Sequence, residues 1–167
     1  ATLCGSRFGR GMIRPGGVGF DADAPMVRDL LERLDEAERD TTSAVELLWN
    51  APSVMARLEE TGPVARETAE RLGLVGPAAR ACGLPRDVRH DHPSGIFRFA
   101  HVPISAWNTG DVFARAYVRW LEVQRSIDFV REQLRSLPPG EVRSRVGALA
   151  PDQIVVALAE GWRGELC

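Results

Sequence analysis

A short stretch rich in glycine, proline and arginine is the part of this chain best suited to chemistry. Between residues 62 and 93, glycines and prolines alternate with Arg80, Asp87 and Arg89. Glycine and proline are the residues that sharp turns require, and guanidinium and carboxylate groups form strong charge-assisted hydrogen bonds. These three side chains could conduct protons or contact a partner protein. We predict that they mainly hold the turns in place.

A second set of charged residues lies between residues 111 and 122. Arg115, Arg119 and Glu122 recur at three- and four-residue spacing, which predicts an ion network along one helix, with an interface to another subunit as the alternative. Asp111 stands just before this helix. It is therefore expected to cap the helix N-terminus or to interact with the helix dipole.

Histidines and cysteines are the residues most able to bind a transition metal. His90 and His92 flank Asp91, but His101 is distant in sequence and no third ligand is evident, so we predict loop histidines and no metal site. Cys4, Cys82 and Cys167 are widely spaced and form no Cys-x-x-Cys pair. A zinc site and a disulfide framework are therefore not indicated, and Cys82 is expected to be a buried, inert thiol in a reducing compartment.

Several separated motifs, in one order along the chain, cover nearly its whole length. They are Gly5-Ser6-Arg7-Phe8, Arg14-Pro15-Gly16-Gly17-Val18, Thr61-Gly62, Gly73-Leu74-x-Gly76-Pro77-x-x-Arg80-Ala81-x-Gly83, Asp87-x-Arg89, Gly110-Asp111-Val112-x-x-Arg115 and Glu160-Gly161-Trp162-Arg163-Gly164-Glu165. This set resembles the large subunit of membrane-bound, group 4 nickel–iron hydrogenases, with a leaning toward the formate hydrogenlyase branch. It is also similar to the 49 kDa quinone-site subunit of respiratory complex I.

The resemblance implies a parent oxidoreductase with a bound redox centre. Metal-bearing members of this family hold nickel and iron through two Cys-x-x-Cys pairs, one before and one after the matched region, because those metals require soft thiolates. Neither pair occurs in this chain. We therefore expect an internal fragment that carries no cofactor and is inactive alone, from a parent that uses either a nickel–iron centre or a quinone.

Arg163 is the candidate catalytic residue that the resemblance implies. It aligns with the family arginine that lies over the metal in hydrogenases, where a fixed guanidinium supplies charge and directed donors. The alternative is an ordinary ion pair of Arg163 with Glu160 or Glu165. Residues in the other motifs are expected to be structural or to support that site from behind: Arg80, Asp87, Arg89, Asp111, Arg115, Glu122 and Glu165.

The resemblance also implies partners and a location. The parent would assemble with an iron–sulfur small subunit and other subunits of a hydrogenase or NADH:quinone oxidoreductase complex, on the cytoplasmic side of the inner membrane and attached through those subunits. Electrons would pass between the iron–sulfur partner and the redox centre, and the resemblance to NADH dehydrogenase also implies NAD binding. The rival hypothesis is a non-catalytic helical scaffold or assembly protein with the same fold.

Composition is consistent with a helical domain that is not inserted in a membrane. The chain has 167 residues, 44% of them apolar, and a formal net charge of −2, which suits one domain over residues 1–167 and gives no field that favours nucleic acid. No apolar run approaches the roughly 20 residues that a membrane span requires. We expect the fragment to self-associate through apolar surface left uncovered.

Apolar periodicity predicts the elements that must position these residues. Two long helices are expected, from Pro25 to about Asn50 and from Phe113 to Leu137, with the proline-rich segment 138–140 ending the second. Shorter helices are expected at about 53–60 and 65–72, with left-handed caps at Gly62 and Gly73. Residues 96–104 could form a short strand or an extended arm, 141–151 a loop, and 154–158 a strand. The predicted fold is mainly α, an antiparallel helical bundle with irregular turns and a minor β element.

Overall fold

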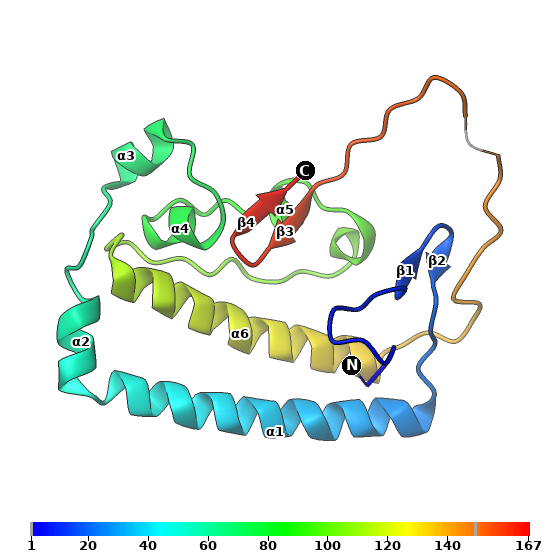
Figure 1. Cartoon of the computed structure of the whole chain (residues 1–167), viewed down its shortest axis with the longest axis horizontal. Helices are drawn as coiled ribbons and strands as arrows, with labels where there is room; N and C mark the ends of the chain where they lie inside the picture. Colours follow the sequence, from blue (N-terminus) through cyan, green and yellow to red (C-terminus); the bar gives the residue numbers. More distant parts are fainter. Residues whose placement is uncertain (1, 149) are drawn as a thin grey trace. The chain divides into compact units, whose positions relative to one another are not determined.

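The structure is a computed structural model that describes residues 2–148 and 150–167. Its helices are α1 (Ala24–Trp49), α2 (Pro52–Leu58), α3 (Arg66–Arg71), α4 (Gly76–Ala81), α5 (Val88–Asp91), the 3-10 helix η1 (Gly95–Arg98) and α6 (Val112–Arg135) (Figure 1). Two antiparallel pairs of short strands complete it: β1 (Ile13–Arg14) with β2 (Gly17–Val18), and β3 (Ala159–Gly161) with β4 (Gly164–Leu166). The predicted mainly α fold with a minor β element is confirmed.

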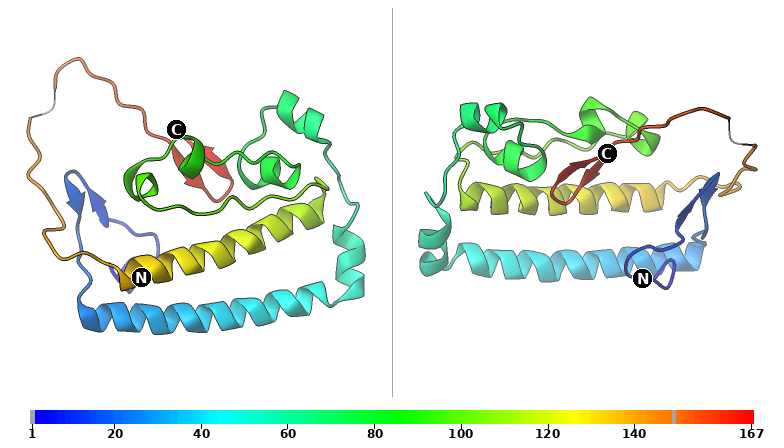
Figure 2. Two further views of the ribbon diagram at one scale, coloured as in Figure 1. Left: turned by 180° about the vertical axis from the view of Figure 1, so that it is seen from behind. Right: turned by 45° about the horizontal axis from the view of Figure 1, so that its top comes forward.

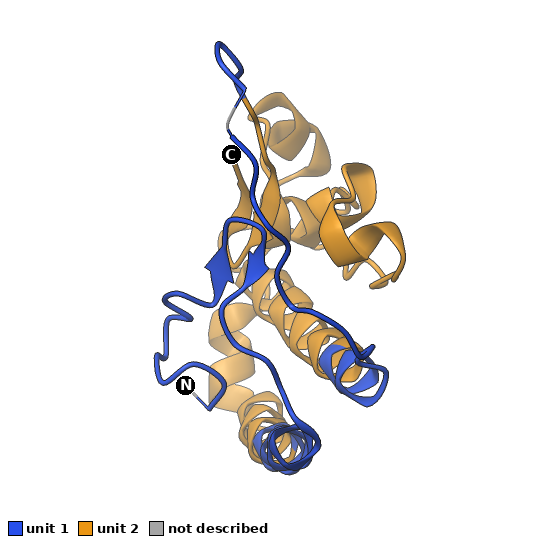
Figure 3. Ribbon diagram, turned by 90° about the vertical axis from the view of Figure 1, so that its right-hand side faces the viewer, with its two compact units in different colours: residues 1–38, 130–154 blue, residues 39–129, 155–167 orange. Residues whose placement is uncertain are grey.

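The described residues form two compact units (Figure 3). Unit 1 contains residues 1–38 and 130–154, and unit 2 contains residues 39–129 and 155–167. Both long helices pass from one unit into the other. The single domain predicted for residues 1–167 stays a prediction.

Unit 1 is organised around a small β-hairpin and an ion pair between helices. β2 continues into a bridge with Arg143, and the Val18 N–H donates to the Val142 carbonyl over 3.0 Å. A Cβ on Gly17 would lie 2.2 Å from that same carbonyl oxygen, so only glycine fits there. Arg131 of α6 pairs with Asp35 and Glu38 of α1. Residues 13–18 thus form a hairpin that segment 142–144 backs.

Unit 2 contains the buried core, and most of its core residues are small. One cluster consists of Ala69, Ala79, Cys82 and Leu84, and a second joins α4 to α6 through Ala81, Ala114 and Val118. Small side chains let the short helices approach closely, but each one contributes little apolar area. The end of α1 meets the start of α6 through Trp49, whose ring lies 5.5 Å from that of Phe113. Figure 2 shows the two helices side by side at this end of unit 2.

The two long helices lie where their periodicity predicts, but they are not equally covered. α6 buries Ala114, Val118 and Ile127, whereas α1 has no fully buried residue among those described. The apolar stripe of α1 is therefore only partly covered by the described chain. None of the described helices has the length and apolarity needed to cross a membrane.

Three local predictions are wrong. Residues 95–98 form η1 and not the start of a strand, so the strand alternative for 96–104 is wrong, while residues 100–104 lie in no helix or strand. The predicted strand at 154–158 is absent: Ile154 is 92% exposed and has no strand partner in the described chain, and the β pair begins only at Ala159. A strand requires a partner for its backbone, which an apolar run alone cannot indicate. Gly62 has the predicted positive φ, 56°, but it does not cap α2, because that helix ends at Leu58. Gly73 follows the last turn of α3 as predicted.

The hairpin β3–β4 packs on the short helices, with β4 against α4 and β3 against α5 (Figures 1 and 2). The closest approach is between two glycines, since a Cβ on Gly76 would lie 2.2 Å from the Cα of Gly164. Gly76 also has a φ of 63°. Glycine is therefore required at position 76 for two reasons, its backbone conformation and the space it leaves.

Gly76→Ala should destabilise the chain more than Gly73→Ala. Both glycines have nearly the same φ, 63° and 65°, so both variants incur the cost of about 1–2 kcal/mol for a left-handed alanine. Only position 76 adds a clash, because nothing lies within 4 Å of a Cβ at position 73. We expect a further loss of roughly 1–3 kcal/mol for Gly76→Ala in chemical unfolding. Equal losses would show that the hairpin does not rest on Gly76.

Candidate functional site

The most concentrated chemistry in unit 2 is a cluster of two arginines and three carboxylates. We call it the charge cluster; its members are Arg80, Asp87, Arg89, Glu122 and Glu160. They come from α4, the start of α5, α6 and β3. Four elements that are separated in sequence therefore meet at one set of charges.

Arg80 is the centre of the charge cluster. It is 1% exposed, and its guanidinium lies 2.9 Å from Glu160, 3.1 Å from Glu122 and 3.5 Å from Asp87. Its Nη1 also donates to the Arg86 carbonyl over 2.9 Å. A buried guanidinium is tolerated only when it is paired and hydrogen-bonded. Arg80 therefore constrains every element that supplies one of its acceptors.

Asp87 and Arg89 form the second part of the charge cluster. The Arg89 guanidinium donates to Asp87 over 2.9 and 2.5 Å and to Glu122 over 3.1 Å. The Asp87 Oδ1 also caps α5 by accepting from the Arg89 N–H. Burial alone would raise the pKa of Asp87, but the hydrogen bonds and charge of Arg89, with the charge of Arg80, hold it below its ordinary value. Asp87 is thus held as a carboxylate.

Glu160 ties the C-terminal hairpin to this cluster. Its Oε1 accepts from Arg80 over 2.9 Å and its Oε2 from the Val88 N–H over 3.3 Å. Glu160 lies in β3, opposite Glu165 in β4, and the turn between the strands contains Trp162 and Arg163. The buried ion pair therefore fixes the base of the turn that carries Arg163.

Arg163 is exposed at the tip of this turn, and neither expected ion pair forms. Glu160 is engaged by Arg80, and no ion pair of Arg163 or Glu165 occurs within residues 2–148 and 150–167. The neighbouring Trp162 is 69% exposed. The guanidinium of Arg163 is therefore held on a fixed hairpin and is accessible to whatever approaches the turn.

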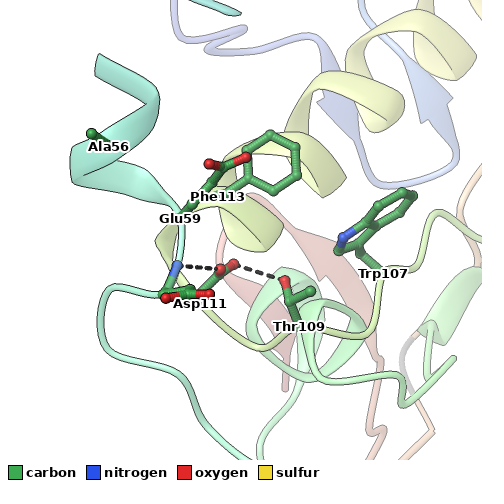
Figure 4. A pocket seen from close by; sticks show the side chains of 7 residues that line it. Ala56, Glu59, Trp107, Thr109, Asp111 and Phe113 are labelled. Carbon is green, nitrogen blue, oxygen red and sulfur yellow. Dashed lines mark hydrogen bonds between the residues drawn. The ribbon is translucent and has the colours of Figure 1, made fainter. Parts of the chain in front are cut away.

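Asp111 holds a different junction, between the end of α2 and the start of α6. Its Oδ1 accepts from the Thr109 hydroxyl at 2.8 Å and its Oδ2 from the Glu60 N–H at 2.9 Å (Figure 4). Its Oδ1 also accepts from the Ala114 N–H at 2.8 Å. Burial would raise the pKa of Asp111, but these hydrogen bonds outweigh it and lower the pKa. Glu60 has a φ of 55°, which this bond helps to hold.

A cavity of about 660 Å³ opens beside Asp111. Figure 4 shows the Glu59 carboxylate beside the Phe113 ring, with Trp107 across from them. Its lining residues are Ala56, Glu59, Glu60, Trp107, Thr109, Asp111 and Phe113. Acidic and aromatic side chains line the cavity, and none of the lining residues belongs to the charge cluster.

The predicted ion network along α6 is wrong. Glu122 points to Arg80 and Arg89, whereas Arg115 donates to the Gly110 carbonyl over 2.8 Å and Arg119 to the Arg115 carbonyl over 2.9 Å. The reason is tertiary: two guanidinium groups from other elements compete for Glu122 and outweigh one partner on the same helix. The helical spacing was correct, but it could not show which side α4 and α5 cover.

The histidines and cysteines offer no assembled metal site in the described chain. The rings of His90 and His101 lie 5.5 Å apart, a contact that their sequence separation concealed. Even so, residues 2–148 and 150–167 contain no group of three or more His, Cys, Asp or Glu arranged to hold a metal ion. Cys82 is buried as predicted, and burial raises the pKa of its thiol, with Arg115 opposing. These residues do not fit a nickel–iron centre, and we assign it no ligand here.

Glu160 is the functional residue that sequence reasoning placed wrongly. The sequence places Glu160 in one of the ordered motifs but predicts only Arg163, three positions away, as its partner. A glutamate near the start of a short strand gives no sign of an arginine 80 residues earlier in the chain. The signal in the sequence is the charge balance of segment 80–89, where three arginines, Arg80, Arg86 and Arg89, face one acidic residue, Asp87.

Glu160→Gln should destabilise the chain, and Glu165→Gln should not. The two residues face each other across β3 and β4, but only Glu160 pairs with buried Arg80. Loss of a hydrogen bond to a charged group costs roughly 1.5–3 kcal/mol. Thermal unfolding and amide hydrogen exchange of residues 159–166 measure the effect. Similar behaviour of the two variants would contradict the anchoring role of Glu160.

Acid sensitivity should depend on Asp87. A folded-state pKa below the unfolded value gives stability that is complete above the unfolded pKa and is lost as pH falls through the folded one. Asp87→Asn should therefore lower stability at pH 7 and flatten its pH dependence between roughly pH 5 and pH 2. Asp40→Asn, on the exposed face of α1, is the control. An unchanged acid profile in Asp87→Asn would disprove the assignment.

Comparisons with known proteins agree with the sequence resemblance. Residues 1–161 match the family model described as the 49 kDa subunit of respiratory-chain NADH dehydrogenase. An NADH-quinone oxidoreductase subunit of Ehrlichia chaffeensis is 31% identical over 88% of this chain and 37% of its own length. The carbon monoxide-induced hydrogenase of Rhodospirillum rubrum is 31% identical over 99% of this chain and 46% of its own length.

A solved structure has a similar fold. The membrane-bound sulfane sulfur reductase, an archaeal respiratory membrane complex, contains a chain that matches with a TM-score of 0.72 and 25% identity over 79% of this chain and 36% of that one. The present chain thus spans less than half the length of these relatives. Since the family model covers residues 1–161 of 167, the chain belongs to the family of the 49 kDa subunit of respiratory-chain NADH dehydrogenase.

Proposed function

We propose that this chain is part of the large subunit of a membrane-associated hydrogenase or NADH:quinone oxidoreductase-like complex. In that complex, electrons pass between an iron–sulfur partner protein and either a nickel–iron centre or a quinone. The 167 residues provide the scaffold of the large subunit and present Arg163 to the redox site. They have no electron-transfer activity of their own.

One observation carries this proposal. An NADH-quinone oxidoreductase subunit and a carbon monoxide-induced hydrogenase match this chain at the same identity, 31%, over 88% and 99% of its length. Both relatives are redox proteins by name, and one name refers to a quinone whereas the other refers to hydrogen. The shared part therefore favours a common role in electron transfer and does not choose between a quinone and a nickel–iron centre.

The geometry of the charge cluster supports the role of Arg163. The position of the hairpin turn is fixed by the Glu160–Arg80 ion pair and by the close contact of Gly76 with Gly164. A guanidinium acts best in electrostatic stabilisation when it is positioned before the reaction, because no reorganisation is then needed. The Arg163 guanidinium also offers five N–H donors in one fixed plane. These properties suit a group that steers charge at a redox site.

The other proposed features concern the assembly. The partners are an iron–sulfur small subunit and further subunits of a complex I-like or hydrogenase assembly, which hold this chain at the cytoplasmic face of the inner membrane. A nickel–iron centre, if the protein uses one, would be held by thiolates outside the 167 residues. Any NAD-binding or formate-linked activity belongs to other subunits.

Substitution of Arg163 in the full-length protein, assembled with its partner subunits, tests this function. Arg163→Gln should lower electron transfer by about 100-fold, because a positioned charge is lost, and Arg163→Lys should recover part of the rate. Hydrogen-dependent and NADH-dependent reduction of quinone and dyes are measured for each assembly. Arg71→Gln, an exposed position on α3, is the matched control.

The wild-type assembly decides between the proposed function and its rival. If it transfers electrons from neither hydrogen nor NADH, a non-catalytic scaffold or assembly role replaces the proposal. If it is active and Arg163→Gln matches the wild type, the redox role of the large subunit stands and the role of Arg163 is wrong.

A further inference from the structure

Two neighbouring arginines on α6 of unit 2 are partly buried without a carboxylate. Arg115 and Arg119 lie one helical turn apart, and both side chains are half-covered. Their acceptors are backbone carbonyls: Gly110 at 2.8 Å and Gly62 at 3.4 Å for Arg115, and Arg115 itself at 2.9 Å for Arg119. No ion pair involves either residue within residues 2–148 and 150–167.

Most other covered arginines in the described chain are paired with carboxylates. Arg80 and Arg89 share three carboxylates, and Arg131 has two. Arg125 also lacks a carboxylate, but it stands apart on α6 and donates to the Pro103 carbonyl and the Ser105 hydroxyl. Backbone carbonyls satisfy individual N–H donors but carry no net charge. Among the described residues of unit 2, Arg115 and Arg119 are therefore two neighbouring arginines whose partly desolvated positive charges no carboxylate compensates.

The pair also repels itself. Burial lowers the pKa of Arg119, and the charge of Arg115 lowers it further, with no carboxylate of the described chain acting in the opposite direction. Two like charges held close together destabilise each other, and partial burial strengthens the effect. A bound anion would remove both costs.

The guanidinium groups keep donors for such an anion. Each guanidinium has five N–H donors, and within the described residues only Nη1 of each side chain is engaged. The buried side-chain atoms that lack a partner in the described chain are Trp49 Nε1 and Arg80 Nε. The remaining nitrogens of Arg115 and Arg119 are thus not sealed in the interior and stay within reach of a ligand.

Trp162 helps to orient Arg119. The Arg119 Cζ lies 5.9 Å from the centre of the Trp162 ring, and Trp162 belongs to the hairpin turn that the charge cluster anchors. A cation above an aromatic face is attracted to it, which restricts the guanidinium at little cost. One side of Arg119 is therefore occupied by the ring, and the in-plane donors remain for a ligand.

We propose that Arg115 and Arg119 form an oxyanion site that binds a carboxylate or phosphate group. The paired guanidinium groups match such a group, since planar forks bind two oxygen atoms at once. The anion is either a free small molecule or a carboxylate side chain of a neighbouring subunit, and the recognition chemistry is the same. The site is independent of the redox role proposed for Arg163.

Titration of the full chain with inorganic phosphate, and separately with acetate, tests the site. The arginine Nε–Hε signals are followed by NMR, and chloride at equal ionic strength corrects for screening. We expect saturable shifts confined to Arg115 and Arg119. Arg119→Gln should weaken phosphate binding by about tenfold, and the affinity of Arg119→Lys should lie between those of the wild type and Arg119→Gln. Arg71→Gln, which removes the same charge from α3, should bind phosphate as the wild type does.

Two results would overturn the proposal. The first is the absence of saturable shifts with both anions in the wild type, which needs no variant to fold. The second is a loss of phosphate binding in Arg71→Gln as large as that in Arg119→Gln, which would show that binding depends only on the net charge of the chain.

The same titration on the full-length protein, assembled with its partner subunits, distinguishes the sources. Shifts that persist there indicate a free anion, and shifts that disappear indicate that a partner's carboxylate already fills the site.

Discussion

The burial of Arg80 is the constraint on which unit 2 depends. A guanidinium that is 1% exposed must be compensated in place, and three carboxylates from α5, α6 and β3 converge on it for that reason. A pair of this kind contributes little net stability against well-packed apolar residues, but it penalises strongly any arrangement that leaves one charge unpaired. The charge cluster therefore determines which elements pack together and adds little to the free energy of unfolding.

The packing around the charge cluster has the opposite character. The core next to it is built mostly of alanines, with one cysteine, one leucine and one valine, and small side chains remove little apolar surface from water. What these small residues permit is proximity: α4 lies against the hairpin at Gly76 and Gly164, and Gly110 reaches the backbone of Val64. Close backbone contact and buried charge thus depend on each other, because the ion pairs reach their partners only when the helices lie this near.

The hairpin β3–β4 is where structure and proposed function meet. Each of its strands has only three residues, and two strands of this length do not form a stable sheet by themselves. Its position comes from Glu160 on the buried side, from the glycine contact at the turn and from the cation above Trp162. The turn itself projects outward with Arg163 exposed. A rigid base and a free tip are what a residue needs if it is to present its charge to a centre that other parts of a complex supply.

The sequence alone determined the helices and the family. The long helices follow from apolar periodicity, their ends from Pro25 and from prolines 138 and 139, and the caps at Gly73 and Asp111 from local rules that involve neighbouring residues only. Family membership follows from ordered motifs, which the matched residues 1–161 confirm. Such features are readable because their causes lie within a few residues of each other.

The tertiary structure decided which charges pair. Glu122 turns away from its own helix, Glu160 reaches Arg80, and the apolar run at 154–158 forms no strand while one forms directly after it. Each outcome depends on competition between groups that are distant in sequence. A carboxylate pairs with the guanidinium whose burial without a partner would cost the most free energy, and that burial arises only when the chain has folded.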